Sequence, residues 1–137
     1  MNIKYVVIIQ CDIAHNRCSG FACTNAFYNK DSVFKDYDDS TRYISFTCGG
    51  CCGKSVATKL EHLSKKLKVK NNIEKDEVSV HLSSCMTTDN YHYDRCPHIE
   101  YIKAIILKKG YKNMIEGSYM SKTAERKRVE GKYNCYS

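Results

Sequence analysis

The sequence lacks the features that mark secreted, membrane-bound and multidomain proteins. It has a single proline in 137 residues, and no low-complexity linker divides it, so one domain is expected. No apolar stretch approaches the roughly 20 residues that a membrane helix requires. The opening residues MNIKYVVIIQCD lack the cleavage site of a secretory leader. We therefore expect a cytoplasmic protein with no membrane partner.

Cysteine, in contrast, is abundant. The chain has nine cysteines, and an odd number does not fit a closed set of disulfides. A chain of this length buries a hydrophobic core without needing bridges to replace one. In a reducing compartment, so many thiols indicate metal or thiol chemistry more than disulfides.

Positive charge is also in excess. The formal net charge is +7, and much of it lies in residues 54–70 and in the tail. Such patches can bind nucleic acid, but a solvated helix face and a solvated tail explain them better. We therefore expect a small-molecule or redox partner of unknown identity and no nucleic acid.

Apolar patterning predicts strands that alternate with helices. Residues 5–9 are continuously apolar and mostly β-branched, which is typical of a strand buried on both faces. Further strands are expected at 42–47, 78–82 and 113–117. Helices are expected near 21–28, at about 52–69, and from Pro97, with Cys96 as cap, to Gly110.

This alternation predicts the fold class. Strands joined by helical crossovers form parallel sheets with helices on both faces. We expect an α/β fold, a small three-layer sandwich with a parallel four-stranded sheet in the order 2-1-3-4, flavodoxin-like in outline. Residues 1–119 would form the domain and residues 120–137 a basic C-terminal tail.

The predicted strand ends bring the cysteines to one edge of the sheet. Cys11, Cys48 and Cys85 end the first three strands, and ligands of open α/β sheets bind at this carboxyl edge. Helix N-termini at the same edge stabilise anions, and the thiolate is the form of cysteine that acts as nucleophile and metal ligand. The other residues expected there are Cys18, Cys23, Cys51, Cys52, Cys96 and His98.

The stretch TCGGCCGKS, residues 47–55, leaves three interpretations open. Cys48 and Cys51 have the spacing of a metal chelate, of a redox pair, or of small buried side chains. Gly49 and Gly50 let the backbone fold tightly and direct N–H groups at sulfur. A phosphate loop is excluded, because position 48 is cysteine where that motif requires glycine.

Several of these segments resemble the CGGC-domain family. The resemblance rests on Cys11, Cys18-x4-Cys23, CGGC at 48–51, HLSSCM at 81–86 and CPHIEYIK at 96–103, and it covers roughly residues 3–117. The family is described as metal-binding, with zinc suggested. The resemblance implies a metal site formed by Cys11, Cys18, Cys23, Cys48, Cys51, Cys85, Cys96 and His98.

This chain departs from the family pattern at three places. Gln10 replaces a usual arginine, Cys52 replaces a usual proline, and Ser118-Tyr119 replaces a frequent Thr-His pair. If that histidine is a ligand in relatives, the coordination here must differ, and Cys52 is a substitute to consider. His62 and His81 are expected to be structural.

The sequence leaves the metal open between zinc and an iron–sulfur cluster. His98 suits a zinc site with three thiolates, whereas the number of thiols exceeds one zinc site and suits a cluster. The bound metal would support sulfur or redox chemistry, or be stored and handed over. The alternative is a metal-free dithiol oxidoreductase using Cys48 and Cys51, so whether the chain is an enzyme stays open.

Overall fold

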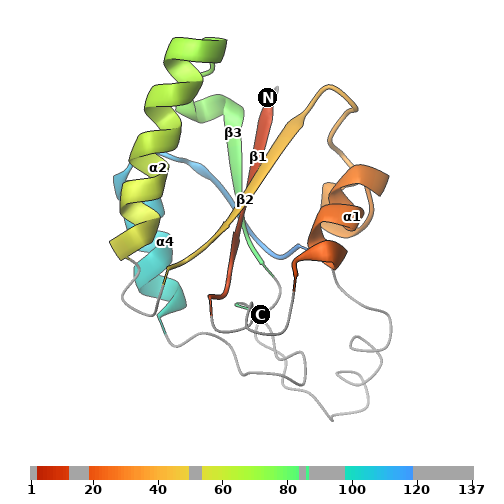
Figure 1. Ribbon diagram of the computed structural model, residues 1–137, viewed down its shortest axis with the longest axis horizontal. Coiled ribbons are helices and arrows are strands. Elements are labelled where there is room, and N and C mark those ends of the chain that lie inside the picture. The colour runs from red at the N-terminus through yellow and green to blue at the C-terminus, as the bar shows by residue number, and fades with distance from the viewer. Residues whose placement is uncertain (1–2, 13–18, 50–53, 84–85, 87–97, 119–137) are drawn as a thin grey trace.

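Four parallel strands form the centre of the protein in a computed structural model (Figure 1). The structure describes residues 3–12, 19–49, 54–83, 86 and 98–118. The sheet order is β2-β1-β3-β4, and each neighbouring pair is parallel, so the predicted topology is confirmed. The strands are β1 (Tyr5–Gln10), β2 (Arg42–Thr47), β3 (Val78–Leu82) and β4 (Asn113–Glu116).

Helices cover both faces of this sheet. Figure 1 shows α2 and α4 on one face and α1 on the other, which is the predicted three-layer arrangement. The helices are α1 (Phe21–Asn29), α2 (Lys54–Lys66) and α4 (Ile99–Lys108). Shorter helical segments are the 3-10 turns η2 (Ser32–Phe34) and η4 (Lys75–Glu77) and the π-helical turn η3 (Leu67–Asn71), which extends α2.

Strand β1 separates two hydrophobic cores. Val7 and Ile9 belong to the core beneath α2 and α4, and Val6 and Ile8 belong to the core beneath α1. All four are fully buried, because side chains alternate between the faces of a strand and both faces are covered. The continuous apolar run of β1 therefore follows from its central place in the sheet.

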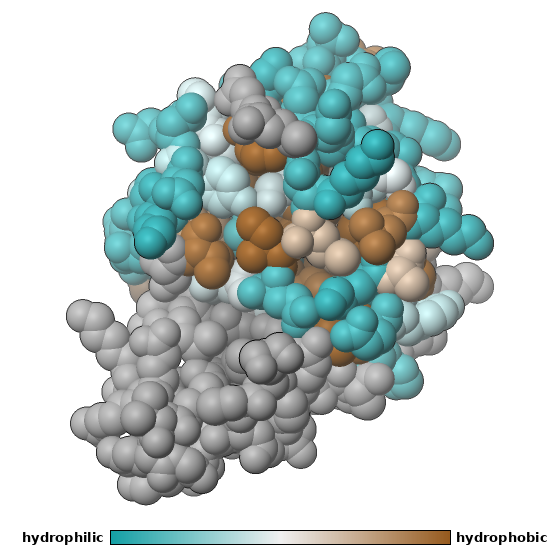
Figure 2. Space-filling view, turned by 180° about the vertical axis from the view of Figure 1, so that it is seen from behind, coloured by the Kyte–Doolittle hydropathy of each residue, from teal (hydrophilic) through white to brown (hydrophobic). Residues whose placement is uncertain are grey.

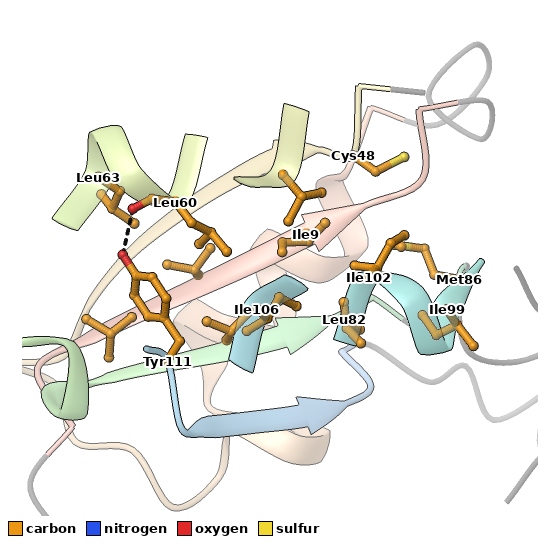
Figure 3. Packing of buried hydrophobic residues seen from close by; sticks show 14 of the residues in the cluster. Ile9, Cys48, Leu60, Leu63, Leu82, Met86, Ile99, Ile102, Ile106 and Tyr111 are labelled. Carbon is orange, nitrogen blue, oxygen red and sulfur yellow. Dashed lines mark hydrogen bonds between the residues drawn. The ribbon is translucent and has the colours of Figure 1, made fainter. Parts of the chain in front are cut away.

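Tyr111 joins α2 to the segment between α4 and β4. Its ring is fully buried in the core beneath α2 and α4. Its hydroxyl donates a hydrogen bond of 2.8 Å to the carbonyl oxygen of Leu60, drawn as a dashed line in Figure 3. This hydrogen bond ties α2 to the start of β4 at the end of the core that is remote from the carboxyl edge of the sheet.

The element boundaries differ from the prediction in a few places. Helix α4 begins at Ile99 with His98 at the N-cap position, later than the expected start at Pro97; Pro97 and Cys96 lie outside the described residues. No helix or strand was expected between the helix near 21–28 and the strand at 42–47, and this segment contains η2. Short 3-10 turns depend on local packing, here the burial of Phe34 beneath α1, and leave little periodic signal.

The outer surface carries some apolar area. Seen from behind, a band of apolar side chains crosses the molecule between hydrophilic regions (Figure 2). Among exposed apolar residues, Ile115 lies on β4, the last strand in the sheet order. In the part of the chain that the structure describes, no helix combines the length and the apolar character needed to cross a membrane.

Candidate metal centre at the carboxyl edge

Cys11 and Cys48 follow the carboxyl ends of the adjacent strands β1 and β2. The register pairs Gln10 with Thr47, so the next residue of each strand is one of these cysteines. The backbone N–H of Cys48 donates a 2.9 Å hydrogen bond to the carbonyl oxygen of Gln10, which continues the ladder past the last strand pair. The sequence prediction that both cysteines end adjacent strands is confirmed.

Both thiols lie on the face of the sheet that α2 and α4 cover. Cys11 follows Ile9 by two residues and packs against the same core, as strand alternation requires. Cys48 belongs to that core and is only 7% exposed, whereas Cys11 is half-buried. In Figure 3 the sulfur of Cys48 points in the direction in which the strands run. Two free thiols therefore share one face and one edge.

Gly49 follows Cys48 in a conformation that only glycine tolerates well. Its φ is +73°, and a Cβ added there would lie 2.4 Å from the Cβ of Ser55 in the first turns of α2. This close approach lets α2 begin directly beside the end of β2. The positive φ and the close approach of Ser55 explain why glycine is needed at position 49. Gly50 lies outside the described residues.

Replacement of Gly49 by alanine is expected to destabilise the protein. A positive φ costs roughly 1–2 kcal/mol for a residue with a Cβ, and the clash with Ser55 adds to that cost. Gly110→Ala is the matched control, since its φ is +94° but its nearest contact is the flexible end of Lys75 at 3.1 Å. Urea unfolding should show the larger loss for Gly49→Ala; equal losses would contradict the close approach.

Lys59 of α2 fixes the end of β2 from the side. Its Nζ donates a 2.9 Å hydrogen bond to the carbonyl oxygen of Thr47, and it lies 5.4 Å from the centre of the Phe46 ring. The ammonium group therefore satisfies the carbonyl of the residue immediately before Cys48. From the sequence, Lys59 was expected on a solvated helix face, because a repeating lysine pattern does not show which lysine turns inward.

Cys23 lies at the same edge but on the opposite face of the sheet. It belongs to the first turn of α1 and packs against the core beneath that helix. Its Sγ is 3.1 Å from the Oγ of Ser118, which follows β4 and is 1% exposed. The described cysteines lie at one edge of the sheet, as the sequence predicted. Cys11 and Cys48 pack on one face of the sheet, however, and Cys23 packs on the other.

His98 is the described histidine at this edge. It is exposed, occupies the N-cap position of α4 and makes no side-chain capping hydrogen bond. Among the described residues alone, no group of three or more His, Cys, Asp or Glu side chains is close enough to hold a metal ion. The remaining predicted ligands, Cys18, Cys51, Cys85 and Cys96, and also Cys52, lie outside the described residues.

His81 lies at the centre of a buried polar network. From the sequence it was expected to be structural, but its partners were not predicted. Its Nδ1 lies 3.0 Å from the carbonyl oxygen of Gly117, and its Nε2 lies 2.7 Å from the hydroxyl of Tyr37. Because a carbonyl only accepts, Nδ1 carries the proton, which leaves Nε2 of the neutral ring as an acceptor that faces the Tyr37 hydroxyl. The Tyr37 hydroxyl is also 2.8 Å from the Oγ of Ser79. No signal in the polar segment 29–41 singles out Tyr37 as this partner.

The burial of His81 makes the stability of the fold depend on pH. Burial lowers the pKa of His81 from 6.5 to about 4, so between these values the unfolded chain binds a proton that the folded chain does not. Stability is therefore lost as the pH falls from 6.5 to 4, by about 3 kcal/mol in all. Urea unfolding of His81→Gln across this range should lack that part of the slope, whereas His62→Gln, at an exposed site on α2, should retain it.

These features define a class of protein: a small parallel α/β sandwich with free thiols at the carboxyl edge of its sheet. The family model of the CGGC domain matches residues 5–119. The chain therefore belongs to the CGGC-domain family, and this membership points to a metal-binding role. No curated protein and no solved structure matches the chain.

Proposed function

We propose that the chain binds zinc or an iron–sulfur cluster through cysteine thiolates at the carboxyl edge of its sheet. The observation that carries the proposal is that Cys11 and Cys48 directly follow the last residue pair of adjacent strands and pack on the same core. Thiolates are the protein ligands that zinc and iron–sulfur clusters share. Two neighbouring thiols supply part of such a site, and further ligands must come from nearby chain.

The covalent spacing of the chain supports four further cysteine ligands. Each of them is within two residues of a described residue, and consecutive Cα atoms are 3.8 Å apart. The pairs are Cys18 with Ser19, Cys51 with Gly49, Cys85 with Met86 and Cys96 with His98.

We assign the centre of the site to Cys48, Cys51, Cys85 and Cys96, with Cys11 and Cys18 closing one side. Cys23 completes that side only if its sulfur gives up the contact with Ser118. Substitution of Cys23 should therefore lower the metal content less than substitution of Cys48. Gly49 and Gly50 would present backbone N–H groups to the bound sulfurs.

The proposed metal would supply a Lewis acid or an electron carrier for sulfur or redox chemistry. The chain's own residues do the positioning. Lys59 holds the Thr47 carbonyl. Among the described residues, the half-buried Cys11 and the exposed His98 are the groups at this edge that a small-molecule or redox partner would reach. His98 favours zinc, because imidazole commonly completes a three-thiolate zinc site.

Cobalt(II) titration of the reduced, metal-free chain tests this proposal. Cobalt bound by several thiolates absorbs strongly through charge transfer from sulfur, so the expected result is a saturable band that zinc abolishes by competition. His98→Gln should weaken binding while leaving the sulfur band in place. Absence of the band in folded, reduced protein would contradict the proposal and favour the metal-free dithiol oxidoreductase.

A further inference from the structure

We infer that Cys11 and Cys48 form a reversible disulfide with each other, a redox modification site distinct from the Cys48-x2-Cys51 pair. The inference concerns the metal-free thiols and stands on the geometry of the described residues. Only the competition between metal and disulfide for these two sulfurs rests on the proposed function.

The sheet register supplies the geometry. Gln10 pairs with Thr47. The hydrogen bond from the Cys48 N–H to the Gln10 carbonyl keeps the two backbone segments side by side for one residue beyond that pair. Neighbouring strands lie about 4.8 Å apart. The Cα atoms of a disulfide are usually about 4.4–6.8 Å apart, so two cysteines at the next position of adjacent strands satisfy this range.

The direction of the side chains also fits. A disulfide cannot form where the two Cβ vectors point apart, and Cys11 and Cys48 both pack on the core beneath α2 and α4. Cys23 fails this requirement, because it packs on the opposite core and its sulfur contacts Ser118. Among the three described cysteines, only one pair is therefore suited to bridging.

Exposure sets the order of the chemical steps. Cys11 is half-buried and Cys48 is buried, so a small disulfide such as oxidised glutathione reaches Cys11 first. The Cys11 thiolate attacks one glutathione sulfur, which forms a mixed disulfide and releases one glutathione thiolate. The Cys48 thiolate then attacks the Cys11 sulfur and releases the second. The two protein thiols lose two protons and two electrons, and the oxidant becomes two molecules of glutathione.

The bridge changes what the edge can bind. A metal site uses thiolates, and the bridge removes the negative charge from both sulfurs. Oxidation would therefore release a metal held by Cys11 and Cys48, and bound metal would protect them. The pair would act as a redox-sensitive gate on the proposed metal site.

Peptide mapping of the full chain tests the inference. Metal-free protein is treated with oxidised glutathione, alkylated and digested with trypsin. Residues 5–17 then form a peptide whose only cysteine is Cys11, and residues 43–54 form a peptide that contains Cys48, Cys51 and Cys52. We expect these two peptides to be joined, and fragmentation between Gly49 and Gly50 to place the link on Cys48.

Two variants sharpen the result. Cys51→Ser should keep the link, and Cys48→Ser should lose it. If Cys48→Ser does not fold, the peptide map of the unaltered chain is sufficient to show whether Cys11 and Cys48 are linked. A bridge between Cys48 and Cys51, or Cys11 that carries only glutathione, would overturn the inference. Zinc added before the oxidant should suppress the link. A link that forms in protein unable to bind metal would preserve this inference and remove the proposed function.

Discussion

Replacement of Cys48 by serine is expected to remove most of the bound metal and to lower the stability of the fold at the same time. Cys48 is buried where β2 ends, and a site assembled by folding couples metal binding to stability. Loss of a ligand should cost more than the roughly 10–100-fold in affinity that outer residues contribute. Elemental analysis after gel filtration gives the metal content, and urea unfolding with and without chelator gives the stability.

Cys135→Ser is the matched control for this substitution. Cys135 lies beyond residues 5–119, which the family model matches, so its loss should change neither the metal content nor the stability. The account is contradicted if Cys48→Ser keeps its full metal content, or if chelator destabilises the variant as much as it destabilises the unaltered chain.

Replacement of Tyr111 by alanine is expected to give the largest loss of stability that is unrelated to the metal. The ring is fully buried between α2 and the sheet, and truncation of a buried aromatic side chain costs about 3–5 kcal/mol. Tyr111→Phe keeps the packing and removes only the hydrogen bond to Leu60, which should cost about 0.5–1.5 kcal/mol. Urea unfolding measures both losses.

The same variants separate the metal site from the rest of the core. Tyr111 precedes β4 and therefore lies at the amino-terminal edge of the sheet, opposite the cysteines. Tyr111→Phe should consequently bind as much metal as the unaltered chain, and chelator should lower the stability of both by the same amount. A loss of metal in Tyr111→Phe would show that stability in general, and not the thiols, controls metal content.

The strands and their order could be predicted because they depend on strong local patterns. A continuous apolar run gives β1 its place, and short segments rich in β-branched and aromatic residues, RYISFT and VSVHL, give β2 and β3 theirs. The crossover rules then leave few sheet orders. The start of α4 was harder, because cap and first-turn residues are assigned from one or two positions. The turn η2 depends on Phe34 meeting α1, a contact that has no local signal.

From the sequence, the candidate site could be assigned to the carboxyl edge of the sheet but not to one of its two faces. Strand ends show that Cys11 and Cys48 lie together, but they do not show which side of the sheet a helical cysteine occupies. Cys23 lies on the other side because α1 covers the face opposite α2 and α4. The contacts of Cys23 with Ser118 and of His81 with Tyr37 join residues that are distant in the sequence, so spacing within the sequence could not reveal them.

The most direct test of a thiolate metal site is the composition of the protein purified without oxygen. An absorption spectrum combined with elemental analysis for zinc, iron and sulfide should find either zinc or iron with sulfide in proportion to the protein. That amount should fall in Cys48→Ser and not in Cys135→Ser. Metal-free protein with an ordinary melting temperature and a disulfide that cycles between Cys48 and Cys51 would contradict the account and support a dithiol oxidoreductase.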